Sequence, residues 1–288
     1  MHWIAGCSIM KRAPVNRIIP FSNVDGPGNR TSIFFQGCTF HCLFCHNPET
    51  IHLCNNCGKC VGTCPVSALS MEDGKVIWDM NRCVTCDACI KTCENFASPR
   101  VRWMSVPEVM GEIRRTAPYI GGITTSGGEC TIYHEFLTEL YAEVQKLGLT
   151  ALIDSNGSLD FSRHPELLAV ADGVMLDVKA VTPEWNDYLI SHSRDLVLKN
   201  LDYLLAAGKL QEVRTIIFPD REEENAATVR YVAEHIKDKC PYKIIRYRPF
   251  GVREHEQDIL GHMTTEEEEA ERFANLARNL GATRAFVV

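Results

Sequence analysis

Apolar residues follow two alternating patterns over the last two thirds of the chain. Short apolar runs, which are typical of buried strands, alternate with segments in which apolar residues recur every three to four positions, as on one face of a helix. The clearest helical segment spans 132–147 and ends before Gly148, a residue type that often terminates helices. Repeated strand–helix units favour a parallel sheet with right-handed crossovers. The pattern therefore predicts an α/β fold.

The same pattern places the individual elements. A short edge strand is expected at 17–20. Core strands are expected at 31–36, 121–125, 150–153, 174–176, 213–218, 243–247 and 284–288. Helices are expected from a capping box at 105–108 to 116, and at 132–147, 196–207, 223–237 and 266–280. We predict an open, partial (β/α)6 barrel of residues 1–50 and 99–288, with residues 51–98 inserted between its first strand and its first helix.

The inserted segment contains an internal repeat of cysteines. Two runs of four, each spaced C-x2-C-x2-C-x3-C, lie 29 residues apart. This spacing is that of two-cluster bacterial ferredoxins, in which the fourth cysteine of each run ligates the other cluster. Paired zinc knuckles are the alternative, but cysteines this close in sequence crowd two tetrahedral sites. The repeat predicts a ferredoxin-like module with two [4Fe–4S] clusters, one held by Cys54, Cys57, Cys60 and Cys93 and the other by Cys64, Cys83, Cys86 and Cys89.

A separate cysteine motif follows the first core strand. Cys38, Cys42 and Cys45 form a C-x3-C-x2-C triplet after the apolar run 33–35. Structural zinc sites use four ligands, so three thiolates on one short loop suit an iron–sulfur cubane better. A cubane has four irons, and three cysteines leave one iron open to a substrate.

The triplet, with Phe44 before its last cysteine, resembles the signature of the radical S-adenosylmethionine (SAM) superfamily. The segments 26–30, 37–38 and 47–48 extend the resemblance to one branch, the activating enzymes of glycyl-radical enzymes. The resemblance implies a third [4Fe–4S] cluster at which SAM is cleaved reductively, and a radical that is then placed on a glycine of a partner glycyl-radical enzyme. The two clusters of the insert would relay electrons from a flavodoxin or ferredoxin. Among activating enzymes with an insert, the nearest named group is the YjjW-like activases.

The resemblance also assigns cofactor contacts at the carboxyl ends of the strands, where parallel α/β folds collect functional groups. Phe44 belongs to the triplet loop. Gly127, Gly128 and Glu129 match the loop that holds the amino group of SAM. A simple turn is the alternative for this short motif.

Further contacts are implied at the next three strands. Lys179 is expected to pair with the SAM carboxylate, and Arg214 matches the arginine that reaches the sulfonium. Asp154, Ser155 and Asp177 offer hard oxygen ligands for a monovalent cation beside that carboxylate. Capping of the following helices is the alternative for the two carboxylates, and an ordinary surface ion pair is the alternative for Arg214.

The sixth strand departs from the family pattern. Relatives often carry a histidine near its end that reaches the cofactor, whereas here the nearest histidine is His255. Either Arg246 or Arg248 takes its place, or the contact is lost.

Composition limits the location and the partners of the protein. The 288 residues carry 14 cysteines and a net charge of −7, which argues against a nucleic-acid substrate. The N-terminus lacks the order of a signal peptide, and no apolar run approaches the ~20 residues of a membrane span. We expect a cytoplasmic monomer whose cysteines bind metal rather than form disulfides. Cys7, Cys130 and Cys240 lie outside both motifs and are expected to be free thiols.

Two other functions stay open. A radical SAM enzyme could instead modify a small molecule or another peptide, although enzymes of that kind usually carry their extra clusters in a C-terminal extension. A non-enzymatic ferredoxin fused to a scaffold is the third possibility, but it leaves the cysteine triplet unexplained.

Overall fold

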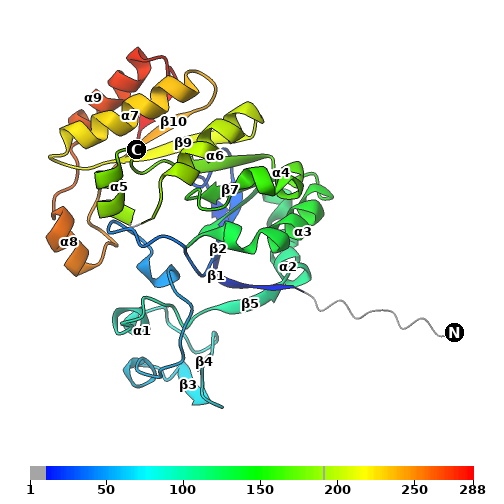
Figure 1. The fold of residues 1–288 in the computed structure, drawn as a ribbon. Helices are drawn as coiled ribbons and strands as arrows, with labels where there is room; N and C mark the ends of the chain where they lie inside the picture. The colour runs from blue at the N-terminus through cyan, green and yellow to red at the C-terminus, as the bar shows by residue number, and fades with distance from the viewer. Residues whose placement is uncertain (1–10, 191) are drawn as a thin grey trace.

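The chain folds into one large sheet with a smaller lobe below it (Figure 1). The computed structural model describes residues 11–190 and 192–288, so that Cys7 lies outside the described residues. Within these residues the sheet has nine strands, in the order β11-β10-β9-β8-β7-β6-β2-β1-β5. Because β11 and β5 do not pair with each other, the sheet is open.

Seven of these strands run parallel and form the predicted core. They are β2 (Arg30–Phe35), β6 (Gly122–Gly127), β7 (Thr150–Ser155), β8 (Gly173–Asp177), β9 (Leu210–Ile217), β10 (Tyr242–Arg246) and β11 (Ala285–Val287). Each begins and ends within a few residues of a predicted strand. The α/β prediction is confirmed.

The first strand of the chain differs from the prediction. β1 (Arg12–Ser22) pairs antiparallel with β2 on one side and with β5 (Arg102–Ser105) on the other. The strand predicted at 17–20 is confirmed as part of β1, but it is longer than predicted and does not lie at the edge of the sheet. Its partner β5 comes after the inserted segment, so no local pattern near residue 20 could reveal that this edge is covered.

Helices pack against the strands that they connect. α3 (His134–Gln145) lies against β7, α6 (Asp195–Ala206) against β8 and β9, α7 (Glu222–Ile236) against β9, and α9 (Glu267–Asn279) against β10. α2 (Val106–Thr116) begins at the predicted capping box, where the Ser105 N–H donates to Glu108 Oε2 over 2.6 Å. Among the described residues, no helix is long and apolar enough to cross a membrane.

Three shorter helices were not predicted from the sequence. They are α4 (Pro165–Val170), α5 (Pro183–Ile190) and α8 (Glu254–Leu260). Each is too short to show a full repeat of the apolar pattern, which explains why periodicity missed them. The chain also forms single 3-10 turns, of which η4 (Cys130–Tyr133) and η5 (Phe161–Arg163) directly precede α3 and the start of α4.

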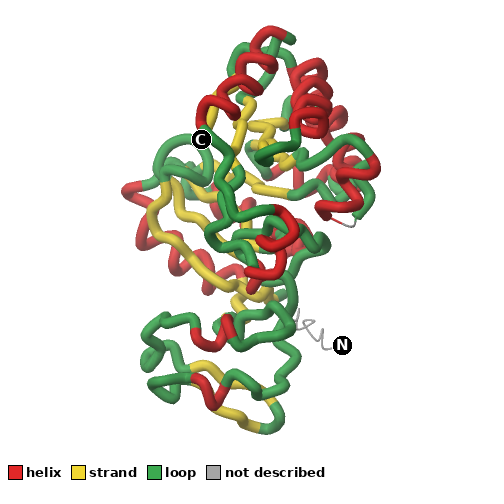
Figure 2. Tube along the Cα trace, turned by 90° about the vertical axis from the view of Figure 1, so that its left-hand side faces the viewer, coloured by secondary structure: helices red, strands yellow, loops and turns green. Residues whose placement is uncertain are grey.

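Residues 51–98 form the lobe at the bottom of Figures 1 and 2. It contains the hairpin β3 (Leu69–Glu72) and β4 (Lys75–Trp78) and the single turn of α1 (Ala88–Lys91). Its apolar cluster is small. Leu69 and two of the cysteines are buried, and Val76 and Trp78 pack against them. A cluster of this size rarely stabilises about 50 residues without a metal or a disulfide. The lobe therefore has few apolar contacts of its own to stabilise it.

Candidate active site

The loops that follow neighbouring strands meet at one end of the sheet. The backbone N–H of Glu129, after β6, donates to the carbonyl of Gly37, after β2, over 2.7 Å. The hydroxyl of Ser126, in β6, donates to Asp154 Oδ2 in β7 over 2.9 Å. The structure thus brings residues predicted from separate motifs to the carboxyl ends of the parallel strands.

The triplet loop lies directly after β2 and is largely buried. The side chain of Cys42 is buried, and Cys38 and Cys45 are half-buried. The ring of Phe44 is also buried and packs edge-on against Phe218, with 5.3 Å between the ring centres. The loop is therefore held by the core rather than displayed as a surface turn.

The protonation of these thiols indicates what they can bind. Burial raises the pKa of Cys38 to about 12 and also raises the pKa of Cys42 and Cys45. Buried thiols stay protonated near neutral pH unless a cation offsets the negative charge of the thiolate. All three are free of disulfides. Three thiols on one largely buried loop fit a thiolate-bound metal group, whose positive charge would compensate for the desolvation.

Two glycines let the β6 loop approach the β2 strand closely. A Cβ atom on Gly127 would lie 2.3 Å from the backbone N and O of Phe35, and one on Gly128 would lie 2.2 Å from the carbonyl oxygen of Gly37. Gly127 also has φ +120°, in the region that favours glycine. These positions require glycine because backbone meets backbone, which supports a functional loop over a simple turn.

The carboxylate of Glu129 is fully enclosed. Its Oε1 accepts from the N–H (3.1 Å) and hydroxyl (2.6 Å) of Thr131 and from the hydroxyl of Ser155 (2.9 Å). Its Oε2 accepts from the N–H of Asn156 over 2.7 Å. Burial raises the pKa of Glu129, although these hydrogen bonds oppose the rise. The side chain therefore ties the ends of β6 and β7 together, and the predicted contact with an ammonium group stays a prediction.

Asp154 is held by a buried ion pair and does not cap a helix. Its Oδ1 accepts from Arg214 Nη1 over 2.9 Å, and Arg214 Nε donates to Glu212 Oε1 over 2.6 Å. The side chain of Arg214 is only 11% exposed, so the surface ion pair considered for it is wrong. Burial alone would lower the pKa of Arg214, but the surrounding carboxylates raise it.

Asp177 and Lys179 lie on the same side of the chain, as their alternation predicted. Lys179 Nζ donates to Asp177 Oδ2 over 2.7 Å, and the ammonium lies 5.4 Å from the centre of the Phe44 ring. Burial would lower the pKa of Lys179, but Asp177 and the neighbouring thiols raise it. The structure thus brings this ion pair to the triplet loop.

Asn156 is a neighbour of the triplet that the sequence reasoning missed. Its Nδ2 lies 3.6 Å from Cys38 Sγ, a hydrogen-bonding distance for sulfur. The residue directly follows Asp154 and Ser155 in the chain, but a side-chain contact with another loop has no local signal. Hydrogen bonds to ligand sulfurs tune iron–sulfur clusters, so this amide belongs to the site.

The segment after β10 also lies against the triplet loop. Arg246 Nε donates to the carbonyl of Thr265 over 2.7 Å, so this side chain is committed to the segment before α9. The carbonyl of Arg248 lies 3.0 Å from His46 Nε2, next to Cys45. His255 is exposed on α8. Of the two arginines considered as replacements, Arg248 contacts His46 beside the triplet, and it does so through its backbone carbonyl.

Comparison with known proteins identifies the family. The sequence model of the Radical SAM superfamily matches residues 32–232, which is more than half of the chain and includes the triplet and the loops that follow β6, β7 and β8. The chain belongs to the radical SAM superfamily.

Two similar proteins are named as activating enzymes. A protein of Haemophilus influenzae, which its name assigns to the glycyl-radical enzyme activating enzymes, is 30% identical over 265 residues, covering 84% of each chain. The indoleacetate decarboxylase activating enzyme of Tractidigestivibacter scatoligenes is 29% identical, covering 85% of this chain and 86% of its own. Among solved structures, QueE from Escherichia coli has a TM-score of 0.50 at 14% identity, covering 96% of this chain and 94% of its own, which is a likeness of fold alone. Membership of this superfamily implies SAM and a [4Fe–4S] cluster as cofactors. The triplet loop of this radical SAM enzyme carries the three thiols that such a cluster needs.

The eight cysteines of the repeat fall into two groups in the lobe of the radical SAM chain. One cavity is lined by Cys54, Cys57, Cys60 and Cys93, and a second by Cys64, Cys83, Cys86 and Cys89. These are the two sets predicted from the repeat, with the fourth cysteine of each run exchanged. Four thiols around each cavity fit a sulfur-rich cluster.

Cys130 and Cys240, in contrast, are buried free thiols outside these groups. The thiol of Cys130 donates within the core, to the carbonyl of Thr125, over 3.4 Å. Neither cysteine forms a disulfide, and their role as free thiols stays a prediction.

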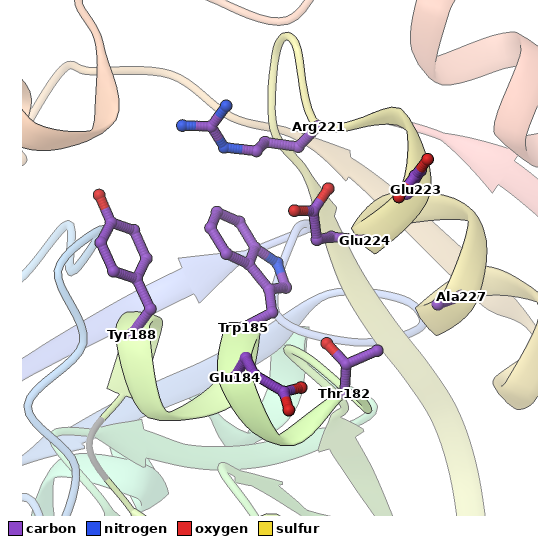
Figure 3. A pocket seen from close by; sticks show the side chains of 8 residues that line it. All are labelled: Thr182, Glu184, Trp185, Tyr188, Arg221, Glu223, Glu224 and Ala227. Carbon is purple, nitrogen blue, oxygen red and sulfur yellow. The ribbon is translucent and has the colours of Figure 1, made fainter.

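An open groove of about 710 Å³ lies beside the radical SAM site, between α5 and the start of α7 (Figure 3). Trp185 stacks on Tyr188 with 5.3 Å between ring centres, and Arg221 lies 5.7 Å from the Trp185 ring. Trp185 also packs edge-on against Phe218, the ring that contacts Phe44. The aromatic wall of the groove is therefore continuous with the triplet loop.

Proposed function

We propose that this radical SAM enzyme is the activating enzyme of a glycyl-radical enzyme, on which it generates a glycyl radical. The proposal rests on the buried three-thiol loop, which lies against the loop of Gly127 and Gly128 and beside Lys179. The relatives named as activating enzymes support the same branch.

When bound, the cluster supplies the electron that splits SAM into methionine and a 5′-deoxyadenosyl radical, which takes a hydrogen atom from a glycine Cα of the partner. Cys38, Cys42 and Cys45 would hold three irons and leave the fourth to the amino and carboxylate groups of SAM. Lys179 would pair with that carboxylate, because its buried ammonium already lies beside the triplet loop. Phe44 would hold the adjoining face of the cofactor.

The amino group of SAM would lie against the backbone of Gly127 and Gly128. The Glu129 side chain already accepts four hydrogen bonds from its own chain, so its main part is to fix the shape of this loop. Positioning of this kind is the principal task of a protein whose cofactor carries the chemistry.

A monovalent cation beside the SAM carboxylate stays part of the proposal. Asp154, Ser155 and Asp177 supply the oxygen ligands expected for it. Asp154 already pairs with Arg214, and Asp177 with Lys179. Cation binding, and a contact of Arg214 with the sulfonium, would each require these ion pairs to rearrange around the cofactor.

The lobe would carry two further [4Fe–4S] clusters and relay electrons from a flavodoxin or ferredoxin to the triplet cluster. Its two connections are fastened directly behind β2. The Gln36 amide donates to the carbonyls of Glu49 and His52, over 2.6 Å each, and the Ser98 N–H donates to the carbonyl of Glu49 over 2.9 Å. These contacts keep the lobe beside the triplet loop, as a relay requires. A two-cluster insert at this place also favours the YjjW-like activases as the subgroup.

Electron paramagnetic resonance on the anaerobically reconstituted and reduced protein tests the proposal. Mixed with SAM and candidate glycyl-radical enzymes, the wild type is expected to produce a glycine-centred doublet on one partner. Cys42→Ala should abolish the doublet because it removes a cluster ligand. Cys240→Ala, which removes a buried thiol far from the triplet in sequence and in the fold, should retain it.

The opposite result would favour the other function considered for this chain. If the cluster signal shifts with SAM but no partner acquires a radical, and 5′-deoxyadenosine forms without any partner, the enzyme modifies a small molecule or a peptide instead.

A further inference from the structure

Two histidines and a glutamate gather where α3 and α4 begin. His134 is the first residue of α3, His164 immediately precedes α4, and Glu166 lies in the first turn of α4. The two imidazole rings have centres 4.2 Å apart, and His164 Nδ1 lies 3.3 Å from Glu166 Oε1. One ligand atom from each of the three lies within 4.8 Å of the other two.

One ring nitrogen in this group of three residues, Nδ1 of His134, lacks a partner. This nitrogen is buried and has no hydrogen-bond partner among the described residues. Buried polar atoms are nearly always paired, because an unpaired one loses its hydration without compensation. His164 and Glu166 are paired with each other, and the two histidine rings are in contact. Neither interaction gives Nδ1 of His134 a hydrogen-bond partner. A bound ion would supply the missing partner.

We propose that His134, His164 and Glu166 bind a divalent transition-metal ion of the Zn²⁺ class. Two imidazoles and one carboxylate are typical ligands for zinc and its neighbours, whereas Mg²⁺ and Ca²⁺ prefer oxygen ligands alone. The side chain of Glu166 is 55% exposed and can move inward to complete the site. Three protein ligands leave a fourth position for water.

The site would connect two segments that lead out of the SAM-binding loops. η4 alone separates His134 from Glu129, and η5 directly precedes His164 in the chain that continues from Asp154 and Asn156. An ion held here would fasten the starts of α3 and α4 to each other. The inference does not depend on which molecule receives the radical, since it concerns metal binding outside the triplet and the lobe.

A calorimetric titration of the protein with Zn²⁺, after its iron–sulfur clusters have been reconstituted, tests the proposal. The wild type is expected to bind about one equivalent of Zn²⁺, and His164→Ala and Glu166→Gln are expected to weaken binding by on the order of 10- to 100-fold. His262→Ala is a matched control, because His262 and Asp258 form a similar exposed pair at 3.2 Å outside the cluster and its loss should change nothing.

All variants keep every cysteine, so zinc bound by thiols contributes equally to each titration. Equal iron and sulfide contents would show that the clusters are intact, and equal far-ultraviolet circular dichroism would show that the fold is unchanged. The proposal is overturned if His134→Ala/His164→Ala, combined in one chain, binds zinc with the same stoichiometry and affinity as the wild type.

Discussion

Lys179 reaches from the end of β8 toward the triplet loop, where its ammonium lies beside the Phe44 ring. Lys179 forms an ion pair with the Asp177 carboxylate at 2.7 Å. Arg214, in β9, forms a similar ion pair with Asp154, in β7. Cations and anions are therefore paired inside the site before a ligand binds. A zwitterionic cofactor such as SAM would exchange these partners for its own charged groups, at a lower cost than burying unpaired charges.

The first prediction at this scale concerns Lys179. Lys179→Met should weaken SAM binding at least tenfold, because a charge-assisted hydrogen bond to the carboxylate contributes about 1.5–3 kcal/mol. The iron content should not change, since Lys179 is not a cluster ligand. SAM affinity is measured by calorimetry on the reconstituted protein.

A second lysine provides the control for this measurement. Lys199 pairs with Asp160 over 2.8 Å, and its side chain is 53% exposed. Lys199→Met should bind SAM as the wild type does. Equal affinities in both variants would remove Lys179 from the proposed site.

Glu129 illustrates the limit of prediction at the scale of single residues. Its place after two glycines indicated a functional loop, and that loop does meet the triplet strand. The burial of the carboxylate, and its four hydrogen bonds to Thr131, Ser155 and Asn156, depend on two segments that only the fold brings together. Sequence spacing could not distinguish a ligand-binding carboxylate from one that holds the loops in place.

At the scale of elements, close contact between the ends of β2 and β6 shapes the site. Gly128 lies against the carbonyl oxygens of Gly37 and Thr50, where an added Cβ would come within 2.2 and 2.7 Å. These neighbours are backbone atoms that cannot rotate away. The loop after β6 must therefore move if this position acquires a side chain.

Gly128→Ala is expected to destabilise the protein by about 1–3 kcal/mol, the usual cost of overpacking, and to weaken SAM binding as the loop moves. Urea denaturation and calorimetry measure the two effects. Gly111→Ala is the matched control, because Gly111 lies in α2 with nothing within 4 Å of the added Cβ. That control should be neutral or stabilising by up to about 1 kcal/mol. If Gly128→Ala behaves like Gly111→Ala, the close approach does not constrain the site.

The elements themselves were predicted unevenly, for physical reasons. Long helices and buried strands after residue 99 carry their own periodic pattern, and each lies close to its predicted place. β5 has four residues and α8 has seven, too few for a period to emerge. Their conformations depend on partners, since β5 becomes a strand by pairing with β1.

At the scale of the whole molecule, the lobe and the sheet are two distinct bodies (Figure 2). Arg253, which precedes α8, lies 4.1 Å from the centre of the Phe96 ring at the end of the lobe. Together with the hydrogen bonds of Gln36, this contact fixes the lobe on the side of the site where electrons would enter. The lobe's own apolar core is small, so its integrity should follow its clusters.

Cys93→Ser tests the exchange of cysteines between the two runs. Cys93 lines the cavity of Cys54, Cys57 and Cys60, although it belongs to the other run. Its replacement should remove about four irons per chain, those of one cubane, and retain the triplet cluster. SAM cleavage driven by flavodoxin should slow more than cleavage driven by a chemical reductant. Unchanged iron content, with Cys240→Ser as the reference, would contradict the ligand role.

The sequence by itself determined the parts of this protein that depend on residues close together in the chain. The cysteine triplet, the repeat of eight cysteines and the periodic strands and helices are all local patterns, because ligands on one loop and side chains on one face are set by spacing. They were sufficient to predict an α/β chain of the radical SAM superfamily, which the family match confirms.

Only the tertiary structure decided which distant groups meet. It pairs Asp154 with Arg214, brings the Asn156 amide to Cys38, covers β1 with β5 and gathers His134, His164 and Glu166 at the starts of two helices. These contacts are set by the packing of strands and helices far apart in the chain. No local pattern records such packing, because each partner taken alone is an ordinary polar residue.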